Sequence, residues 1–180
     1  MKKLILCVAL LTGFSVVVGA ETIPDSSIFI EKTKIANKQI SKLAHRKFNR
    51  QIFIKDSGKS KNLLDFLNEA YNVEDSIEDI ANQKNKILNL QVASYGIAET
   101  PIGKTYHDVA SCMFIDRKTG CILYRASDIL CVGQWDGIES WKTDEGEMVD
   151  FSAIRKSILD RTNADTDLLK RENYSRCEKQ

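Results

Sequence analysis

The sequence predicts an α+β domain: N-terminal helices packed on an antiparallel meander sheet, followed by a C-terminal helix and a disulfide-stapled tail. Three observations carry this prediction. Apolar residues in the first half recur mainly at helical spacing. Short β-forming runs between residues 105 and 149 alternate with turn signals. Several cysteines stand in the second half of a chain that begins like an exported protein.

Residues 1–20 have the pattern of a secretory signal peptide. Lys2 and Lys3 precede an apolar run from Leu4 to Ala20, which ends in small residues before Glu21. A membrane-spanning anchor is the alternative, but the run of 17 residues is shorter than the roughly 20 that a spanning helix needs. We therefore expect a cleaved signal and a periplasmic or secreted protein whose chain starts at Glu21.

The mature chain would carry almost no net charge. The sequence has 26 Lys and Arg against 25 Asp and Glu, and loss of residues 1–20 removes two of the lysines. A balanced charge does not favour nucleic acid as a partner, because phosphate binding requires a basic surface. No internal repeat or linker divides residues 21–180, which we expect to form one domain with a helical part (26–95), a sheet (105–149) and a C-terminal helix and tail (150–180).

A long helix is expected from Ser26 or Ser27 to about Gln51. Its apolar stripe would consist of Ala36, Ile40, Leu43, Ala44, Phe48 and Ile52. Its other face would be basic: Lys32, Lys34, Lys38, Lys42, Arg46 and Lys47. Such a face is usually solvated, although a basic amphipathic helix can also bind an anionic membrane or an acidic partner.

A second helix is expected from about Lys61, and a third after Asp75, which forms an approximate capping box with Glu78. Residues 88–95 fit a helix or a strand, and Gly96 and Pro101 are expected to end that segment. Residues 62–82 contain six acids and no Lys or Arg, whereas residues 23–61 contain ten Lys and Arg against three acids. We expect these two segments to pack together.

The sheet is expected to contain four strands in sequence order: Val109–Ile115, Cys121–Tyr124, Ile129–Trp135 and Ile138–Trp141. Residues 116–120 end in Gly120 and predict the first tight turn, and Asp136-Gly137 predicts the second. Beyond the sheet, Asp150 is expected to cap a helix whose apolar residues are Phe151, Ile154, Ile158 and Leu159.

Signal cleavage would leave an even number of cysteines, which favours two disulfides: Cys112, Cys121, Cys131 and Cys177. In the predicted hairpin Cys112 lies opposite Arg125 or Ala126, about 13 Å along the ladder from Cys121. A disulfide requires Cα atoms within about 7 Å, so this pair is disfavoured. Two pairings stay open: Cys121–Cys131 with Cys112–Cys177, or Cys112–Cys131 with Cys121–Cys177.

No residue pattern specifies catalysis, a metal or a cofactor. His107 and Cys112 could form a nucleophile pair, but neighbouring strand residues alternate faces and an exported cysteine is usually oxidised. The acidic cluster Asp144, Glu145, Glu147 and Asp150 does not fit a calcium-binding loop and is better interpreted as a solvated turn. We therefore assign no catalytic residue, metal ligand or cofactor.

The second hairpin is the predicted binding surface: Trp135, Asp136, Trp141 and Tyr124. Tryptophan and tyrosine dominate interface hot spots, although they also fill protein cores. The leading functional hypothesis is an exported, non-enzymatic protein-binding module, such as an inhibitor or immunity-type protein acting against an envelope-active toxin or hydrolase. The alternatives are a small hydrolase that uses His107 with a nearby cysteine or carboxylate, and an envelope protein that docks by its basic helix.

Overall fold

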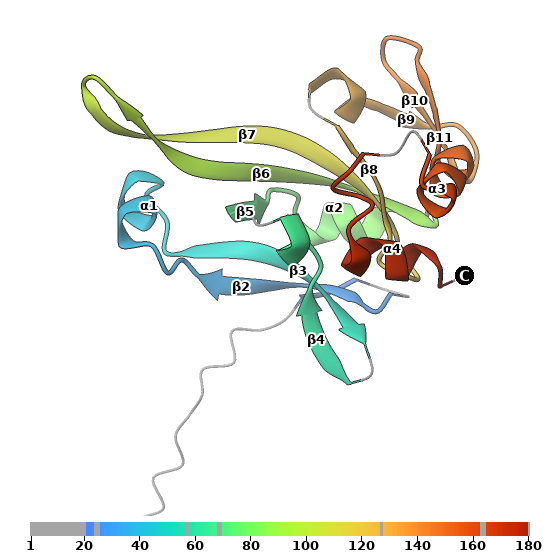
Figure 1. Cartoon of the computed structure of the whole chain (residues 1–180), viewed down its shortest axis with the longest axis horizontal. Coiled ribbons are helices and arrows are strands. Elements are labelled where there is room, and N and C mark those ends of the chain that lie inside the picture. The colour runs from blue at the N-terminus through green and yellow to red at the C-terminus, as the bar shows by residue number, and fades with distance from the viewer. Residues whose placement is uncertain are drawn as a thin grey trace, which may run out of the picture.

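The computed structural model describes residues 21–23, 26–56, 58–67, 70–126, 128–162 and 165–179, so the predicted signal peptide, residues 1–20, lies outside the described part. Within these residues the chain forms three antiparallel sheets and four short helices (Figure 1). The predicted fold class is wrong, because strands dominate and no N-terminal helical layer exists in the described part. The C-terminal helix and the disulfide staples are present.

The first sheet replaces the long N-terminal helix. Its strands, in spatial order, are β1 (Glu21–Thr22), β2 (Ile28–Lys34), β3 (Phe48–Asp56) and β4 (Lys59–Asn62). Ile28 pairs with Ile54 and Ile30 with Ile52, and all four side chains are buried. Short runs of isoleucine and phenylalanine at both ends of the segment favour strands, and their cross-strand pairing outweighs the helical spacing between them.

Only residues 38–43 of the predicted first helix are helical. Asn37 caps α1 (Lys38–Leu43) by accepting hydrogen bonds from the backbone of Gln39 and Ile40, and the helix has no buried residue. His45, with a φ of 52°, ends this turn and leads the chain into β3. The basic docking helix of the membrane hypothesis is therefore not formed.

The second sheet contains the longest strands. Its order is β5 (Ala70–Val73), β6 (Ile87–Thr100), β7 (Gly103–Asp116) and β8 (Ile122–Ala126). The segment after Lys61 is not a helix but β4, a 3-10 turn η1 (Asp65–Leu67) and β5. The ambiguous residues 88–95 are strand, and the predicted end of this segment at Gly96 is wrong, because Gly96 lies inside β6. Pairing with β7 along its whole length holds β6 extended through that glycine.

The third predicted helix is shorter than expected. α2 (Ile77–Asn82) begins after Ser76, whose hydroxyl accepts a hydrogen bond from the backbone of Asp79, so Asp75 is not the cap. The carboxylate of Asp75 accepts a hydrogen bond from the backbone of Gln91 in β6 instead. A polar side chain near the start of a helix can accept a hydrogen bond either from the helix backbone or from the backbone of a neighbouring strand.

The third sheet is formed by β9 (Gly133–Trp135), β10 (Ser140–Thr143) and β11 (Met148–Asp150), with β10 in the centre. A 3-10 turn, η2 (Asp128–Cys131), replaces the first part of the predicted third strand and separates the second and third sheets, whereas β9 forms its last part. The expected single meander is therefore wrong. Both predicted hairpins are confirmed: Cys112 pairs with Ala126 across the first, and Gly137 has a φ of 90° in the turn of the second.

The hydrophobic core lies between the first two sheets and continues under the third. Buried residues of β2 and β3 join those of β6, β7 and β8 in one cluster that also includes Trp141 and Phe151. Figure 1 shows the long β6–β7 hairpin running across β2 and β3, with α3 (Phe151–Asp160) and α4 (Arg171–Cys177) at the opposite end from α1. The predicted cap of α3 is confirmed, because Asp150 accepts hydrogen bonds from the backbone of Ser152 and Ala153.

The basic and acidic N-terminal segments do adjoin, as expected from their charge, although strands rather than helices bring them together. Arg46 forms an ion pair of 3.7 Å with Glu74. Arg50, on β3, donates from its guanidinium to the backbone carbonyl of Asp75. The charge asymmetry of the sequence therefore predicted a contact whose geometry it could not specify.

Candidate functional site

The predicted binding residues line the core more than the surface. Trp135 and Trp141 are directly opposite in the β9–β10 pair, with ring centroids 5.2 Å apart. Trp141 is buried and its indole donates to the Leu130 carbonyl at 3.2 Å. Trp135 is half-buried, and its ring also contacts Phe114 and Phe151 at 6.1 and 5.8 Å.

The other two predicted residues differ in exposure. Tyr124 is half-buried and its ring lies 6.4 Å from that of Phe114, whereas Asp136 is exposed in the hairpin turn. Gly133 permits the close approach of β9 to β10 and Trp141, because a Cβ there would stand 2.2 Å from the Lys142 carbonyl and 2.9 Å from the Trp141 indole nitrogen. The aromatic rings therefore join the third sheet to the core, and their role as a binding surface stays a prediction.

The candidate catalytic residues do not come together. Cys112 is buried in a disulfide with Cys131, and His107 lies five positions before it on β7, with its exposed ring over Gly96. The acidic residues at 144–147 lie in the exposed turn between β10 and β11. Across the described residues, no group of three or more His, Cys, Asp or Glu could hold a metal ion.

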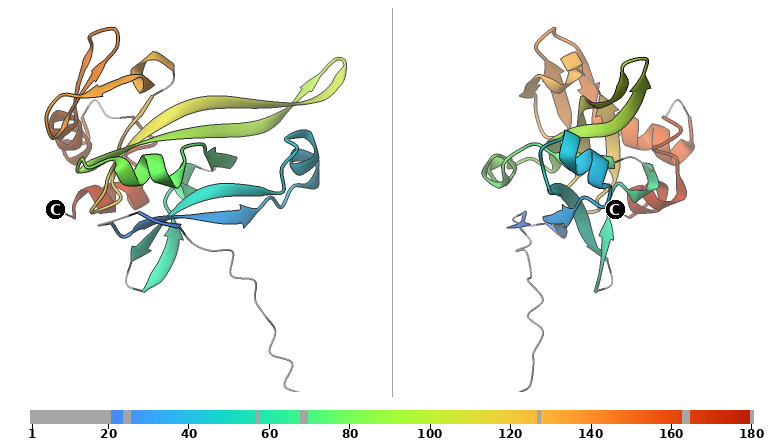
Figure 2. Two further views of the ribbon diagram at one scale, coloured as in Figure 1. Left: turned by 180° about the vertical axis from the view of Figure 1, so that it is seen from behind. Right: turned by 90° about the vertical axis from the view of Figure 1, so that its left-hand side faces the viewer.

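The end of the β6–β7 hairpin projects from the body. We call residues 96–110 the arm; Figures 1 and 2 show its tip extending past α1. β5 pairs with β6 only up to Tyr95, and β8 pairs with β7 only from Cys112. Among the described residues, both outer edges of the arm therefore lack a neighbouring strand. Ile102 at the tip is 93% exposed.

The base of the arm is held firmly on the first sheet. The Arg46 guanidinium lies 4.9 Å from the centre of the Tyr95 ring and donates to the Tyr106 hydroxyl at 3.3 Å. Asn49 donates to the Tyr95 hydroxyl. Burial raises the pKa of both phenols, although the charge of Arg46 opposes the shift, so both stay neutral donors and acceptors at physiological pH. The arm is thus presented from a fixed base.

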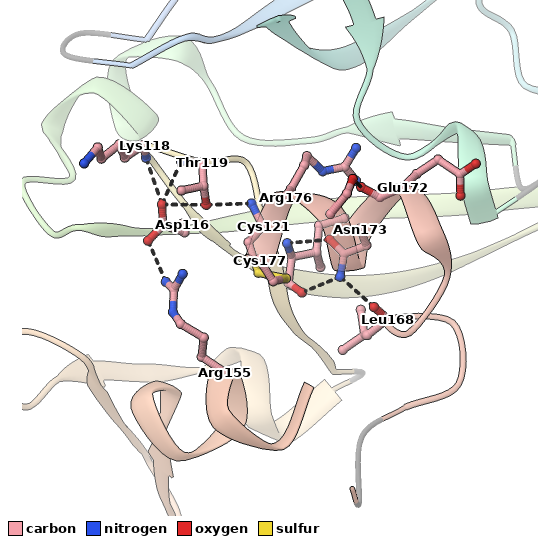
Figure 3. Close-up of a disulfide and its surroundings, with 12 residues drawn as sticks. Asp116, Lys118, Thr119, Cys121, Arg155, Leu168, Glu172, Asn173, Arg176 and Cys177 are labelled. Carbon is pink, nitrogen blue, oxygen red and sulfur yellow. Dashed lines mark hydrogen bonds and ion pairs between the residues drawn. A yellow bond between two sulfur atoms is a disulfide. The ribbon is translucent and has the colours of Figure 1, made fainter. Parts of the chain in front are cut away.

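A second candidate region surrounds the Asp116–Gly120 turn between β7 and β8. Cys121 follows this turn and forms a disulfide with Cys177 at the end of α4 (Figure 3). Asn173, fully buried on α4, accepts from the backbone nitrogen of Ile122 at 2.8 Å and donates to its carbonyl at 3.0 Å. An asparagine side chain thereby pairs with β8 as a neighbouring strand would, and α4 is fixed against the turn.

The carboxylate of Asp116 organises the turn. One oxygen accepts hydrogen bonds from the backbone of Lys118 and Thr119 and from the Thr119 hydroxyl, and the other accepts from Arg155 of α3 at 2.6 Å. Burial of the carboxyl would raise its pKa, but the hydrogen bonds from Thr119 and Arg155 outweigh burial and lower it. Asp116 is therefore an ionised structural carboxylate.

Two hollows flank this turn. The smaller, of about 440 Å³, contains the Asp116–Arg155 pair together with Lys86 and Lys156. The larger, of about 800 Å³, lies between the β3–β4 hairpin, α4 and Lys118, and we call it the Arg176 hollow. Figure 3 shows Arg155 directed at Asp116, and Arg176 apart from that pair, near Glu172. Each hollow thus contains one buried arginine.

Sequence reasoning missed both the arm and the Arg176 hollow. The alternation of Leu88, Leu90 and Val92 was the available signal for a long strand, and Pro101 marks its turn. No sequence signal marks Arg176 beyond its position before Cys177. Among the described residues, no helix has the length and apolar character that a membrane crossing requires.

Comparison with known proteins identifies no relative: no family model, no curated protein and no solved structure matches this chain.

Proposed function

We propose that the protein is an exported, non-enzymatic protein-binding module that contacts its partner through the arm. The two disulfides are compatible with an exported protein. A partner in the periplasm or outside the cell, such as a toxin or hydrolase that this protein inhibits, fits that location. Inhibition requires a rigid recognition element rather than a catalytic centre.

One observation carries the proposal: residues 104–110 of β7 offer an accessible sheet edge. Every residue there except Tyr106 is exposed, and no described strand pairs with this side. Unpaired backbone donors and acceptors on a strand edge accept an additional strand from another chain. Ile102 would add an apolar anchor at the tip, because a large exposed apolar side chain gains free energy when a partner covers it.

The proposal is tested by capture of the partner from the extracytoplasmic fraction of the source organism with the tagged mature protein. We expect one protein to be retained, and Ile102→Asp to reduce its retention at least tenfold. The matched control is Ile138→Asp, which changes another exposed isoleucine, 73% accessible, in the turn of the β9–β10 hairpin. Both variants should keep the wild-type melting temperature, since neither side chain is packed.

Equal retention by both variants would show that the arm tip is not the contact. A second variant, Ala110→Pro, then tests the strand edge itself. Even-numbered residues of β7 direct their backbone N–H away from β6, as Asp116 does toward Cys121, so proline at 110 removes one donor from the unpaired side. Undiminished retention by a folded Ala110→Pro protein would remove the arm from the interface altogether. Loss of retention by Trp135→Ala at unchanged stability would instead restore the second hairpin as the binding surface.

A further inference from the structure

We propose that the Arg176 hollow is a carboxylate-binding site, in which the guanidinium of Arg176 is the principal ligand. The ligand would be a small organic acid or the C-terminal carboxylate of a peptide. This inference does not depend on the arm, which occupies a different part of the molecule.

The guanidinium is buried but incompletely hydrogen-bonded. Arg176 is 8% exposed, and one terminal nitrogen donates to the Leu63 carbonyl at 3.0 Å. Its central carbon lies over the Phe66 ring, 5.5 Å from the ring centre. Nε is buried and donates to no acceptor in the described part of the chain. An arginine has five N–H donors, so donor capacity remains for a ligand in the hollow.

Arg155 has a carboxylate partner in an ion pair, whereas Arg176 has none among the described residues. Arg155, the other buried arginine, contacts Asp116 at 2.6 Å, whereas no described carboxylate lies within ion-pair distance of Arg176. Asp56 is engaged by Lys61 at 3.0 Å and by Lys179 at 3.6 Å. Burial accordingly lowers the pKa of Arg176 to about 10, although the charges of Glu172 and Asp56 oppose the shift. A buried charge without a counter-ion is costly, and a bound anion would offset that cost.

The shape and charge of the hollow favour a carboxylate over a more highly charged anion. Five cationic side chains line it against three carboxylates: Lys55, Lys61, Lys118, Arg176 and Lys179 against Asp56, Asp65 and Glu172. That small surplus suits one or two negative charges. The planar guanidinium matches the planar carboxylate through paired hydrogen bonds. Phe53, Ile54 and Phe66 add apolar surface, and about 800 Å³ accommodates a ligand larger than a simple ion.

The fold holds Arg176 in place from two sides. Cys177, the next residue, is tied to Cys121, which fixes the last turn of α4 beside the Asp116–Gly120 turn. Gly120, with a φ of 69°, lets that turn approach closely: a Cβ there would stand 2.7 Å from the Ile54 side chain and 3.6 Å from Cδ of Arg176. A preorganised donor loses little freedom on binding, so the position of the guanidinium favours recognition.

The Nε–H resonance of Arg176 in a ¹⁵N-labelled wild-type protein provides a direct test. The probes are succinate, N-acetyl-leucine as a mimic of a peptide C-terminus, and N-acetyl-leucinamide as its uncharged match. We expect the two carboxylates to shift this resonance in a saturable way and the amide to leave it unchanged. Tighter binding of N-acetyl-leucine would identify a peptide terminus as the source, and tighter binding of succinate a free organic acid.

A resonance that is unmoved by both carboxylates, or is moved equally by the amide, overturns the proposal. So does inorganic phosphate binding at least tenfold more tightly than either carboxylate. Arg176→Met keeps the aliphatic stem beside Phe66 and should weaken carboxylate binding at least tenfold, as followed by the backbone resonances of Lys118 and Thr119. Arg171→Met, an exposed arginine of the same helix, is the control and should bind as the wild type does.

Arg176→Lys settles the case in which the methionine variant does not fold. It retains the charge but loses the planar fork, so the proposal expects at least a fivefold loss of carboxylate affinity in a folded protein. Unchanged affinity in that variant would show that the fork is not the ligand and would overturn the assignment.

Discussion

Asp116 stabilises its own turn and links that turn to a helix far along the chain, a contact that no local sequence motif predicts. Its carboxylate binds the backbone of its own turn on one side and Arg155 of α3 on the other. The residue thereby links β7, the turn and a helix that begins 35 positions later at Phe151. Because its hydrogen bonds favour the ionised form despite burial, its contribution to stability depends on pH.

We expect the stability difference between wild type and Asp116→Asn to be constant at neutral pH and to shrink as the pH falls below about 4, the ordinary aspartate value. The pKa of Asp116 is lowered in the folded protein, so its stabilisation is present above the unfolded-state pKa and is lost as the pH falls through the folded-state value. Chemical denaturation across pH 2–8 measures this. A difference that grew on acidification would contradict the assigned direction.

Asp75 should show the opposite dependence and serves as the internal contrast. Burial is the main cause that raises its pKa, although the hydrogen bond from Gln91 opposes the shift. A raised folded-state pKa means that the wild type gains stability relative to Asp75→Asn as the pH falls through that value. The same denaturation series therefore separates the buried Asp116 from the half-buried Asp75 by the sign of their slopes.

Trp135 is expected to contribute to stability, because its ring packs on Phe114, Trp141 and Phe151. We expect Trp135→Ala to lower the free energy of unfolding by about 2 kcal/mol, less than for a fully buried tryptophan. The control Ile138→Ala in the same hairpin should change it by less than about 0.5 kcal/mol. Urea denaturation decides; an unchanged stability of Trp135→Ala would make the ring available to a partner.

Two secondary-structure elements, the arm and α4, differ in how the rest of the protein holds them. Among the described residues no strand pairs with the two outer edges of the arm, and Arg46, Tyr95 and Tyr106 anchor its base. α4 has seven residues, too few for a stable isolated helix, and is fixed by Asn173 and the Cys177 disulfide. Short elements in this fold depend on long-range links.

The two disulfides should therefore differ in their effect. Cys121 and Cys177 are 56 positions apart, and Cys112 and Cys131 only 19. Loop-closure entropy predicts losses of about 4 kcal/mol for the double alanine variant of the first pair and about 3 kcal/mol for the second. Urea denaturation at pH 7 compares them. A larger loss for Cys112 and Cys131 would show that local packing, rather than loop length, determines the effect.

For the molecule as a whole, the predicted export would place these cysteines in a compartment where disulfides persist. We expect the native protein to begin at Glu21, the first residue of β1, with all four remaining cysteines oxidised. Intact-mass analysis of the protein from its native extracytoplasmic fraction, with and without reduction, measures both. A mass that included residues 1–20, or that showed four free thiols, would contradict the export signal.

Local signals in the second half of the chain predicted structure well. The Asp136-Gly137 turn, the hairpin at residues 116–120 and the cap at Asp150 all form where expected, because each depends on neighbouring residues. The hairpin register also disfavoured Cys112–Cys121, and the structure contains one of the two pairings that remained open. Short-range chemistry was sufficient for these features.

The sequence by itself determined the turns at residues 116–120 and 136–137, the helix cap at Asp150, and the contact between the basic and acidic segments. Its prediction of export stays a prediction, with which the two disulfides are compatible. Only the tertiary structure decided that residues 28–56 form strands, because the pairing of Ile28 with Ile54 joins residues far apart in the chain and overrides the local helical period. It likewise decided the Arg176 hollow, whose walls come from β3, β4, the β7–β8 turn and α4. Buried area and charge at such sites depend on contacts between segments far apart in the chain. The local periodicity of the sequence does not specify those contacts.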